Sequence, residues 1–200
     1  WILSKVNTLA KDVTENMDKF ELGIALQKVY DFIWDEFCDW YVETAKYRIY
    51  HKEEEKAAAD CVLWVLKTVL KQALKLLHPF MPFITEEIYS VLVPEEESLM
   101  MSEWPQFHAE WDFPAEENVM EHVKEITRGI RNMRAEMNVP NNRKTKVYVV
   151  CEDTEICDGI STLENSIKPL MMAEKILVQQ TKENIADNAV SVVVPDAVVY

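Results

Sequence analysis

The stretch FELGIALQKVYDFIWDEFCDWYVETAKYRIY, from Phe20 to Tyr50, decides the fold class. Apolar side chains recur in it every three or four residues, a spacing that places them along one face of an α-helix. This row consists of Leu22, Leu26, Val29, Ile33, Phe37 and Trp40, and Thr44 continues it. We therefore predict one long helix over residues 20–50, buried along that face.

Similar patterns on both sides of this stretch predict further helices. They cover residues 1–18, 56–78, 82–93 and 115–137, and the third helix buries Leu63, Leu66, Leu70, Ala73 and Leu77. Pro79 ends the third helix because the residue before a proline is pushed out of the α region. Pro82 suits the first turn of the fourth helix. Residues 94–114 lack periodicity, and we expect an extended connection held at Trp104.

The sequence changes character after Pro140. Thr145–Cys151 alternates and is rich in β-branched residues, which predicts a strand. We expect a helix over 155–173 and two more strands, over 175–179 and 189–194. The predicted fold class is mainly α, a five-helix bundle followed by a small β-α-β-β unit. The predicted domains are residues 1–139 and 140–200.

Composition excludes several protein classes. The chain has three glycines, too few and too scattered for a Rossmann fingerprint or a P-loop. It has neither a signal peptide nor an apolar run long enough to span a bilayer, so we expect a soluble protein. The opening WILSKVNTLAKDV has the pattern of a helix inside a protein, which leads us to expect a piece of a longer chain. The four cysteines, Cys38, Cys61, Cys151 and Cys157, lack metal-site spacing, and we expect them buried and reduced, as in the cytoplasm.

No set of residues indicates catalysis. The four histidines are scattered along the chain, at His51, His78, His108 and His122. No Gly-x-Ser-x-Gly motif is present for a nucleophile elbow. An acidic row, Asp31, Asp35, Asp39 and Glu43, is typical of a helix face that is solvated or paired with bases on a neighbouring helix. We therefore predict no catalytic residue, no metal site and no cofactor site.

The charge is unevenly distributed. Formal net charge is −14, yet residues 124–146 hold seven basic residues against two acidic ones. The basic residues are Lys124, Arg128, Arg131, Arg134, Arg143, Lys144 and Lys146. The first four step by four, three and three residues and so share one side of the fifth helix. A solvated basic face is one interpretation, and binding of phosphates by guanidinium groups is the other.

Aromatic residues crowd the second helix. They are Phe32, Trp34, Phe37, Trp40 and Tyr41. Packing against two neighbouring helices accounts for most of them. The alternative is that one or two, with Phe37 or Trp40 as the candidates, remain near the surface and stack on unpaired bases.

Three segments taken together resemble a known family. DEFCDWYVETAK (Asp35 to Lys46), LLHPFMPFITEEIY (Leu76 to Tyr89) and RNMRAEMNVPNNRK (Arg131 to Lys144) are similar to signature segments of the anticodon-binding region of bacterial valyl-tRNA synthetases. SEWP (Ser102 to Pro105) lies between the last two in the expected order. The middle segment is shared with leucine and isoleucine ligases, whereas the first and third favour the valine branch. Asn141 and Asn142 depart from the family, which often has prolines or lysines there.

This resemblance implies a tRNA-binding module without catalytic or editing domains. Its implied partners are tRNA(Val) and the rest of the synthetase chain. The resemblance also implies a monomer that does not bind a membrane. ATP and magnesium would serve the parent enzyme and not this chain. The candidate tRNA-binding residues are Phe37, Trp40, Lys46, Arg48, Arg128, Arg131, Arg134, Arg143 and Lys144. The alternatives are the same module of an isoleucine or leucine ligase, or an acidic helical scaffold for protein interactions.

Overall fold

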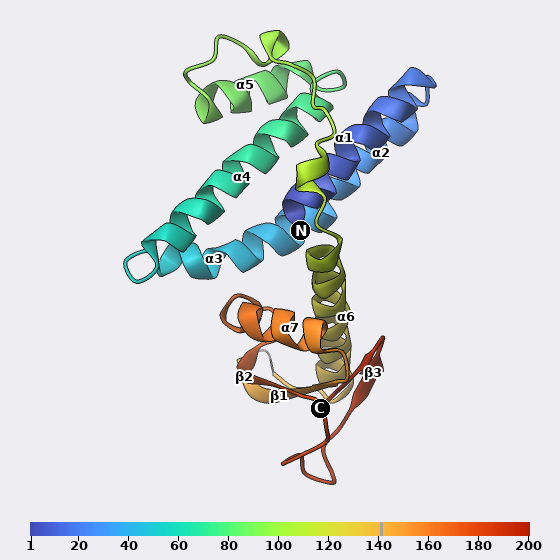
Figure 1. Ribbon diagram of the computed structural model, residues 1–200, viewed down its shortest axis with the longest axis vertical. Helices are drawn as coiled ribbons and strands as arrows, with labels where there is room; N and C mark the ends of the chain where they lie inside the picture. Colours follow the sequence, from blue (N-terminus) through green and yellow to red (C-terminus); the bar gives the residue numbers. More distant parts are fainter. Residues whose placement is uncertain (141) are drawn as a thin grey trace. The chain divides into compact units, whose positions relative to one another are not determined.

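Helical segments occupy most of the chain from Ile2 to Glu136 (Figure 1). The structure is a computed structural model that describes residues 1–140 and 142–200. Asn141, one of the two residues that depart from the family pattern, lies outside the described residues. The chain divides into two compact units, Trp1–Pro114 and Ala115–Tyr200.

The first unit is built from α-helices joined by short connections. They are α1 (Ile2–Asp18), α2 (Leu22–Asp31), α3 (Glu43–Tyr50), α4 (Lys56–Leu77) and α5 (Pro82–Leu92). The π-helical segment η1 (Phe32–Val42) joins α2 and α3, and the short 3-10 turns η2 (Leu99–Met101) and η3 (Ala109–Trp111) follow α5. The helix predicted over residues 20–50 is therefore confirmed as a continuous helical path, although its middle has wider turns than an α-helix.

The buried faces of two helices differ from the predicted ones. Of the row predicted in α2, Val29 is buried as expected, whereas Leu22 and Leu26 are exposed and Ala25 is buried. In α4, Ala73 is buried as predicted, but Leu63 is 48% exposed. The other buried residues of α4 are Ala59, Val62, Val69, Leu74 and Leu76. Apolar residues occur on more than one side of each helix, so periodicity alone does not identify the side that packs.

The core of the first unit lies between α1, the α2–η1 path and α4. Its buried members include Val6 and Val13 of α1, Val29 and Phe32 of the second path, and Leu76 of α4. Burial of each such side chain stabilises the folded state by roughly 1.5–3 kcal/mol relative to leaving it exposed.

The connection after α5 is held against α1 by side-chain hydrogen bonds. Trp104 donates from Nε1 to Thr14 Oγ1 at 2.8 Å, as expected for its anchoring position. Asn7 donates to the carbonyl of His108 and accepts from its backbone N–H, both at 2.8 Å.

The second unit combines two helices with a sheet. Its elements are α6 (Pro114–Glu136), β1 (Thr145–Cys151), α7 (Thr154–Ile167), β2 (Ala173–Gln179), β3 (Val192–Val194) and β4 (Ala197–Val199). The strand order is β2-β1-β4-β3, with β1 parallel to β2 and the other pairs antiparallel.

Helix α7 ends at Ile167, earlier than predicted, because Pro169 has no N–H to continue the helical hydrogen bonds. Strand β4 was not predicted. The mainly α fold class with a small sheet is confirmed.

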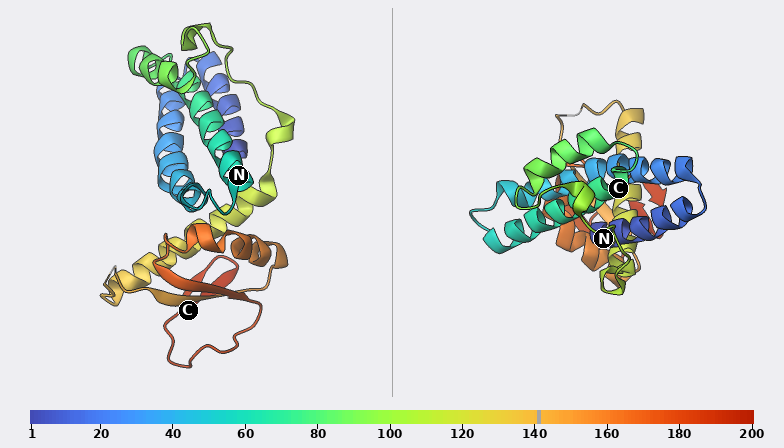
Figure 2. Two further views of the ribbon diagram at one scale, coloured as in Figure 1. Left: turned by 90° about the vertical axis from the view of Figure 1, so that its left-hand side faces the viewer. Right: turned by 90° about the horizontal axis from the view of Figure 1, so that it is seen from above.

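Both helices of this unit lie over the same face of the sheet (Figure 2). A Cβ on Gly129 of α6 would lie 3.2 Å from methyl carbons of Val192 and of Val194 in β3. A Cβ on Gly159 of α7 would lie still closer to Val119 of α6, at 2.6 Å and 2.7 Å from its methyl carbons. Helix α6 therefore belongs with the sheet, and the compact units divide before it, whereas the sequence placed a boundary after it at residues 139 and 140.

No helix within residues 1–140 and 142–200 is long and apolar enough to cross a membrane.

Candidate nucleic-acid interface

Two arginines of α6 are exposed. Arg128 pairs with Glu125, one turn earlier in the same helix, at 2.7 Å, and the Arg128 side chain is 53% exposed. Arg131 donates from Nε to the backbone carbonyl of Leu170 at 3.1 Å. An ion pair as exposed as Arg128–Glu125 contributes little to stability, so a phosphate could replace the carboxylate at small cost.

The other two basic residues of the predicted row are buried, which differs from the expectation of a single exposed row. Lys124 is 1% exposed and pairs with Glu121 at 2.9 Å. Arg134 is 7% exposed. It follows Thr127 by seven residues and Ile130 by four, so it lies on the same buried side of α6 as these two residues.

Arg134 holds the segment that follows α6. Its Nη2 atom donates to the carbonyl of Pro140 at 3.0 Å and to the carbonyl of Arg143 at 2.7 Å. Its Nη1 atom donates to Thr145 Oγ1 at 3.2 Å. Arg134 is therefore a structural residue that holds the carbonyls of Pro140 and Arg143 and the side chain of Thr145.

Two further basic residues lie on the segment that Arg134 fixes. Arg143 and Lys144 are exposed, and within the described part of the chain neither forms an ion pair. Thr145 N donates to the carbonyl of Met172 at 3.4 Å, which brings this segment close to the Leu170 carbonyl that Arg131 binds. We call Arg128, Arg131, Arg143 and Lys144 the basic strip; it lies around the C-terminal end of α6.

Lys46 and Arg48 belong to α3 of the first unit. Lys46 donates to Glu43 at 2.5 Å, and this hydrogen bond raises the pKa of the Lys46 ammonium. Lys46 therefore keeps its positive charge at neutral pH. Arg48 is half-buried.

The two candidate stacking residues are buried, as the apolar row predicted for this helix requires, and neither lies near the surface as the stacking alternative supposed. Phe37 is 7% exposed and lies in the core, with its ring stacked on Tyr41 at a centroid distance of 6.3 Å. Trp40 is likewise 7% exposed. The exposed aromatic residues of this path are Tyr30 and Trp34, whose ring centroids lie 6.3 Å apart. Neither Tyr30 nor Trp34 was predicted as a stacking residue. Trp34 lies on a different side of the helix from Phe37 and Trp40, and this position could have identified it.

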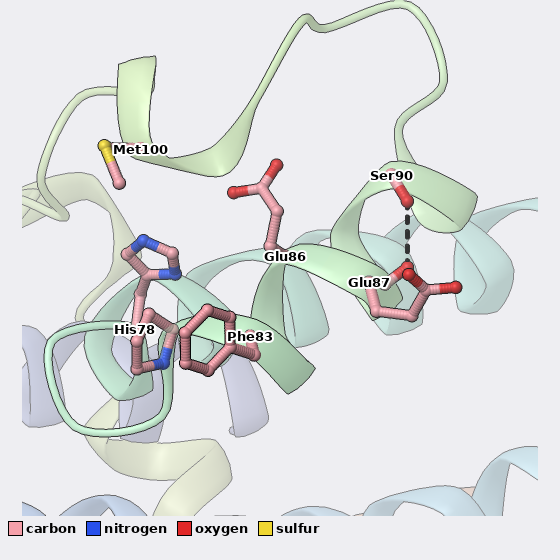
Figure 3. A pocket seen from close by; sticks show the side chains of 7 residues that line it. His78, Phe83, Glu86, Glu87, Ser90 and Met100 are labelled. Atoms are coloured by element: carbon pink, nitrogen blue, oxygen red, sulfur yellow. Dashed lines mark hydrogen bonds between the residues drawn. The ribbon is translucent and has the colours of Figure 1, made fainter.

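Figure 3 shows a shallow pocket of about 270 Å³ beside α5. His78, Glu86 and Ser90 line it, but each is already engaged. His78 Nδ1 is 2.8 Å from Thr85 Oγ1, Ser90 Oγ donates to the carbonyl of Glu87, and Glu86 accepts from the Leu99 N–H. Thr85 is fully buried and donates its hydroxyl hydrogen to the carbonyl of Met81, so the contact of His78 with Thr85 presents no nucleophile to this pocket.

The chain matches a known protein family over most of its length. Residues 1–149 match the family described as the anticodon-binding domain of tRNA ligase. The chain belongs to this family. The resemblance inferred from the three sequence segments is thereby confirmed, and the buried core and the exposed arginines of α6 both lie within the matched residues.

Relatives of this anticodon-binding domain are valine–tRNA ligases. The chain is 47% identical to the enzyme of Clostridium perfringens over 194 residues, which cover 97% of the chain and 22% of that enzyme. It is 43% identical to the enzyme of Clostridium tetani, over 100% of the chain and 22% of that enzyme. It is 44% identical to the enzyme of Carboxydothermus hydrogenoformans, over 78% of the chain and 17% of that enzyme. The chain thus spans about a fifth of the length of these relatives.

The cysteines and acids of this anticodon-binding domain form no metal site in the described ranges. Cys151 and Cys157 are buried, and burial raises the pKa of the Cys157 thiol to about 11. Cys61 is exposed and Cys38 only half-buried, so the expectation of four buried cysteines was wrong for these two. Asp31, Asp35 and Asp39 are exposed, as expected for a solvated row.

Proposed function

We propose that this chain holds the anticodon stem-loop of tRNA(Val) for a valine–tRNA ligase, whose other parts attach valine to that tRNA. The family match over residues 1–149 supports the RNA ligand, and the names of the relatives support valine. A pocket for valine cannot identify a tRNA, so recognition requires contacts elsewhere. Unpaired loop bases offer edges and faces that bases inside an A-form helix do not.

The basic strip is the surface that we assign to the RNA. The observation that carries this assignment is the exposure of Arg128 and Arg131 on a helix of the matched region. Planar guanidinium groups bind phosphate oxygens through two parallel hydrogen bonds. Arg143 and Lys144 would add charge beside them, and Lys46 and Arg48 would contact RNA from the first unit. Arg134, Phe37 and Trp40 would act through the positions of other residues, since all three are buried.

The remaining parts of the assignment concern the longer ligase. We place ATP, magnesium and the valine chemistry in regions outside this chain, which spans 22% of its relatives. The rest of the ligase chain would be its protein partner, in a monomeric cytoplasmic enzyme. Four free thiols suit a reducing compartment.

The test uses Arg128→Ala/Arg131→Ala in the full-length ligase. We expect KM for tRNA(Val) to rise about tenfold or more, while valine-dependent ATP–pyrophosphate exchange is unchanged, because that half-reaction needs no tRNA. Loss of two phosphate contacts should also lower the slope of log binding constant against log salt by about 1.4–1.8. Lys19→Ala, which removes an exposed charge from the end of α1, is the matched control.

An unchanged KM and an unchanged salt slope would remove the basic strip from the RNA interface. Arg128→Lys/Arg131→Lys keeps the charge and loses the planar fork. An intermediate KM is expected for this variant if the contacts to phosphates are bidentate.

A further inference from the structure

The sheet of the second unit has one face that its helices leave open. Along β1, Val147, Val149 and Cys151 are buried, whereas the side chains between them are half-exposed or exposed. Helices α6 and α7 cover one face of the sheet (Figure 2). The close approach of Gly129 to Val192 and Val194 places these side chains of β3 on that face, and the strand register places the buried side chains of β1 on the same face. The alternate residues therefore form an outer face that no described helix of this unit covers.

Two tyrosines lie side by side in the middle of this outer face. The N–H of Tyr148 donates to the carbonyl of Tyr200, and the N–H of Tyr200 donates to the carbonyl of Tyr148, both at 2.9 Å. Residues paired in this way on antiparallel strands have Cα atoms about 5.5 Å apart and side chains on the same face. Leu177 is the neighbour of Tyr148 on β2. Both tyrosines are partly exposed.

Lysines surround this pair at one end of the sheet. Lys146 and Lys175 are register partners on β1 and β2 and both are exposed, so their ammonium groups extend from the same face. Lys182 Nζ lies 4.9 Å from the centroid of the Tyr200 ring. Arg143 and Lys144 directly precede β1, and the acidic residues next to these lysines in the chain are Glu174 and Glu183. This part of the surface is therefore cationic although the chain carries a net charge of −14.

Aromatic rings on an open sheet, bordered by cations, match the requirements of single-stranded RNA. Unpaired bases stack on aromatic side chains, and lysines bind the phosphates that link them. The five basic groups attract a polyanion, and its flat bases are complementary to the two rings.

We propose that this outer face binds single-stranded RNA, with bases stacked on Tyr148 and Tyr200 and phosphates held by Lys146, Lys175 and Lys182. The proposal rests on the proposed function only in that the ligand is RNA. The outer face of the sheet is a different surface from the one that contains Arg128 and Arg131, so the proposal gives the sheet a binding role of its own.

The first experiment measures binding of the 200-residue chain to oligouridylate, with amide NMR spectra to locate the contacts. We expect shifts in the resonances of β1, β2 and β4. Tyr148→Leu should weaken binding about 5- to 150-fold, because one stacking contact is lost. Tyr148→Phe keeps the ring and should bind within about twofold of the wild type. Tyr30→Leu, which removes an exposed ring from α2, is the matched control.

The second experiment keeps the proposal testable if Tyr148→Leu fails to fold. Lys146→Gln/Lys175→Gln should weaken binding and lower the salt slope by about 1.4–1.8, while Lys19→Gln changes neither. Unshifted strand resonances, or unchanged binding by both variants, would overturn the proposal. Concentration-dependent dimerisation that Tyr148→Leu abolishes would also overturn it, because the face would then bind a second copy.

An RNA hairpin with the anticodon stem-loop sequence separates this proposal from the proposed function. If Arg128→Ala/Arg131→Ala weakens hairpin binding while oligouridylate leaves the sheet unshifted, the proposed function stands and this inference fails. If oligouridylate binds the sheet while the hairpin binds independently of both arginines, the basic strip fails and this inference stands.

Discussion

The guanidinium group of Arg134 donates a hydrogen bond to the backbone carbonyl of Arg143, with Nη2 and the carbonyl oxygen 2.7 Å apart. One arginine is buried and the other is exposed. The buried residue therefore determines where the exposed residue leaves the protein surface. A basic segment in an acidic chain can thus contain residues of two kinds, those that meet a ligand and those that position them.

Replacement of Arg134 by alanine should destabilise the second unit. The change removes three hydrogen bonds and leaves the carbonyls of Pro140 and Arg143 without this donor. We expect the free energy of unfolding to fall by roughly 2–3 kcal/mol, measured by urea denaturation of the chain. Asn132→Ala, at an exposed position of the same helix, should change it by less than about 0.5 kcal/mol. Equal stability of the two variants would show that Arg134 does not hold the segment.

Replacement of Glu125 by glutamine should strengthen RNA binding. Glu125 pairs with Arg128 at 2.7 Å and so competes with a phosphate for the same guanidinium group. It also repels the RNA backbone. We expect the Kd for an anticodon stem-loop hairpin to fall about two- to fivefold at low salt, and the gain to shrink as salt rises. Glu136→Gln, at the end of the same helix, controls for the change in net charge. A weaker complex would indicate that the carboxylate orients Arg128 for binding.

Helix positions could be predicted because their signals are local. Pro79 and Pro82 mark the break between α4 and α5, and the structure places the break there. The buried side of a helix is decided by its neighbours, which the sequence does not reveal. Leu63 and Val62 are adjacent in α4 and equally apolar, but only Val62 is buried.

The same limit applies to the site. The spacing of Lys124, Arg128, Arg131 and Arg134 correctly placed these residues along one side of α6. Lys124 and Arg134 are nonetheless buried, whereas Arg128 and Arg131, which lie between them in the sequence, are exposed. Spacing could not predict which of these four residues are buried. Arg134 binds the carbonyls of Pro140 and Arg143, and these come close to it only in the folded chain.

Replacement of Gly159 by alanine should destabilise the contact of α7 with α6. A Cβ at this position would lie 2.6 Å and 2.7 Å from the methyl carbons of Val119, whose β-branched side chain cannot turn aside freely. We expect a loss of about 1–3 kcal/mol in thermal or urea unfolding. Val119→Ala introduced into the same variant should restore part of it.

Gly23→Ala is the matched control for this substitution. A Cβ at Gly23 would meet no atom within 4 Å, and the residue lies in the first turn of α2. Alanine there should stabilise the chain by up to about 1 kcal/mol, because the unfolded chain loses freedom and helix propensity improves. If both alanines had the same effect, the close packing at Gly159 would not limit stability.

Acid should weaken the attachment of the loop after α5. Hydrogen bonds from Lys71 and from the Tyr89 hydroxyl, the latter at 2.5 Å, hold the pKa of the Glu96 carboxyl below its usual range. Because the folded-state pKa is lower than the unfolded one, the stabilisation is complete above the unfolded value of about 4.3 and is lost as the pH falls through the folded value. The groups are partly exposed, so it amounts to less than about 1 kcal/mol.

Glu96→Gln should therefore lower the melting temperature at neutral pH, and the difference from the wild type should shrink as the pH falls through the folded-state pKa and the wild-type carboxyl takes up its proton. Glu97→Gln alters an exposed carboxylate of the same loop and serves as the control. A difference between wild type and Glu96→Gln that persists unchanged at low pH would mean that the glutamine disturbs packing, and that the charge of Glu96 does not hold the loop.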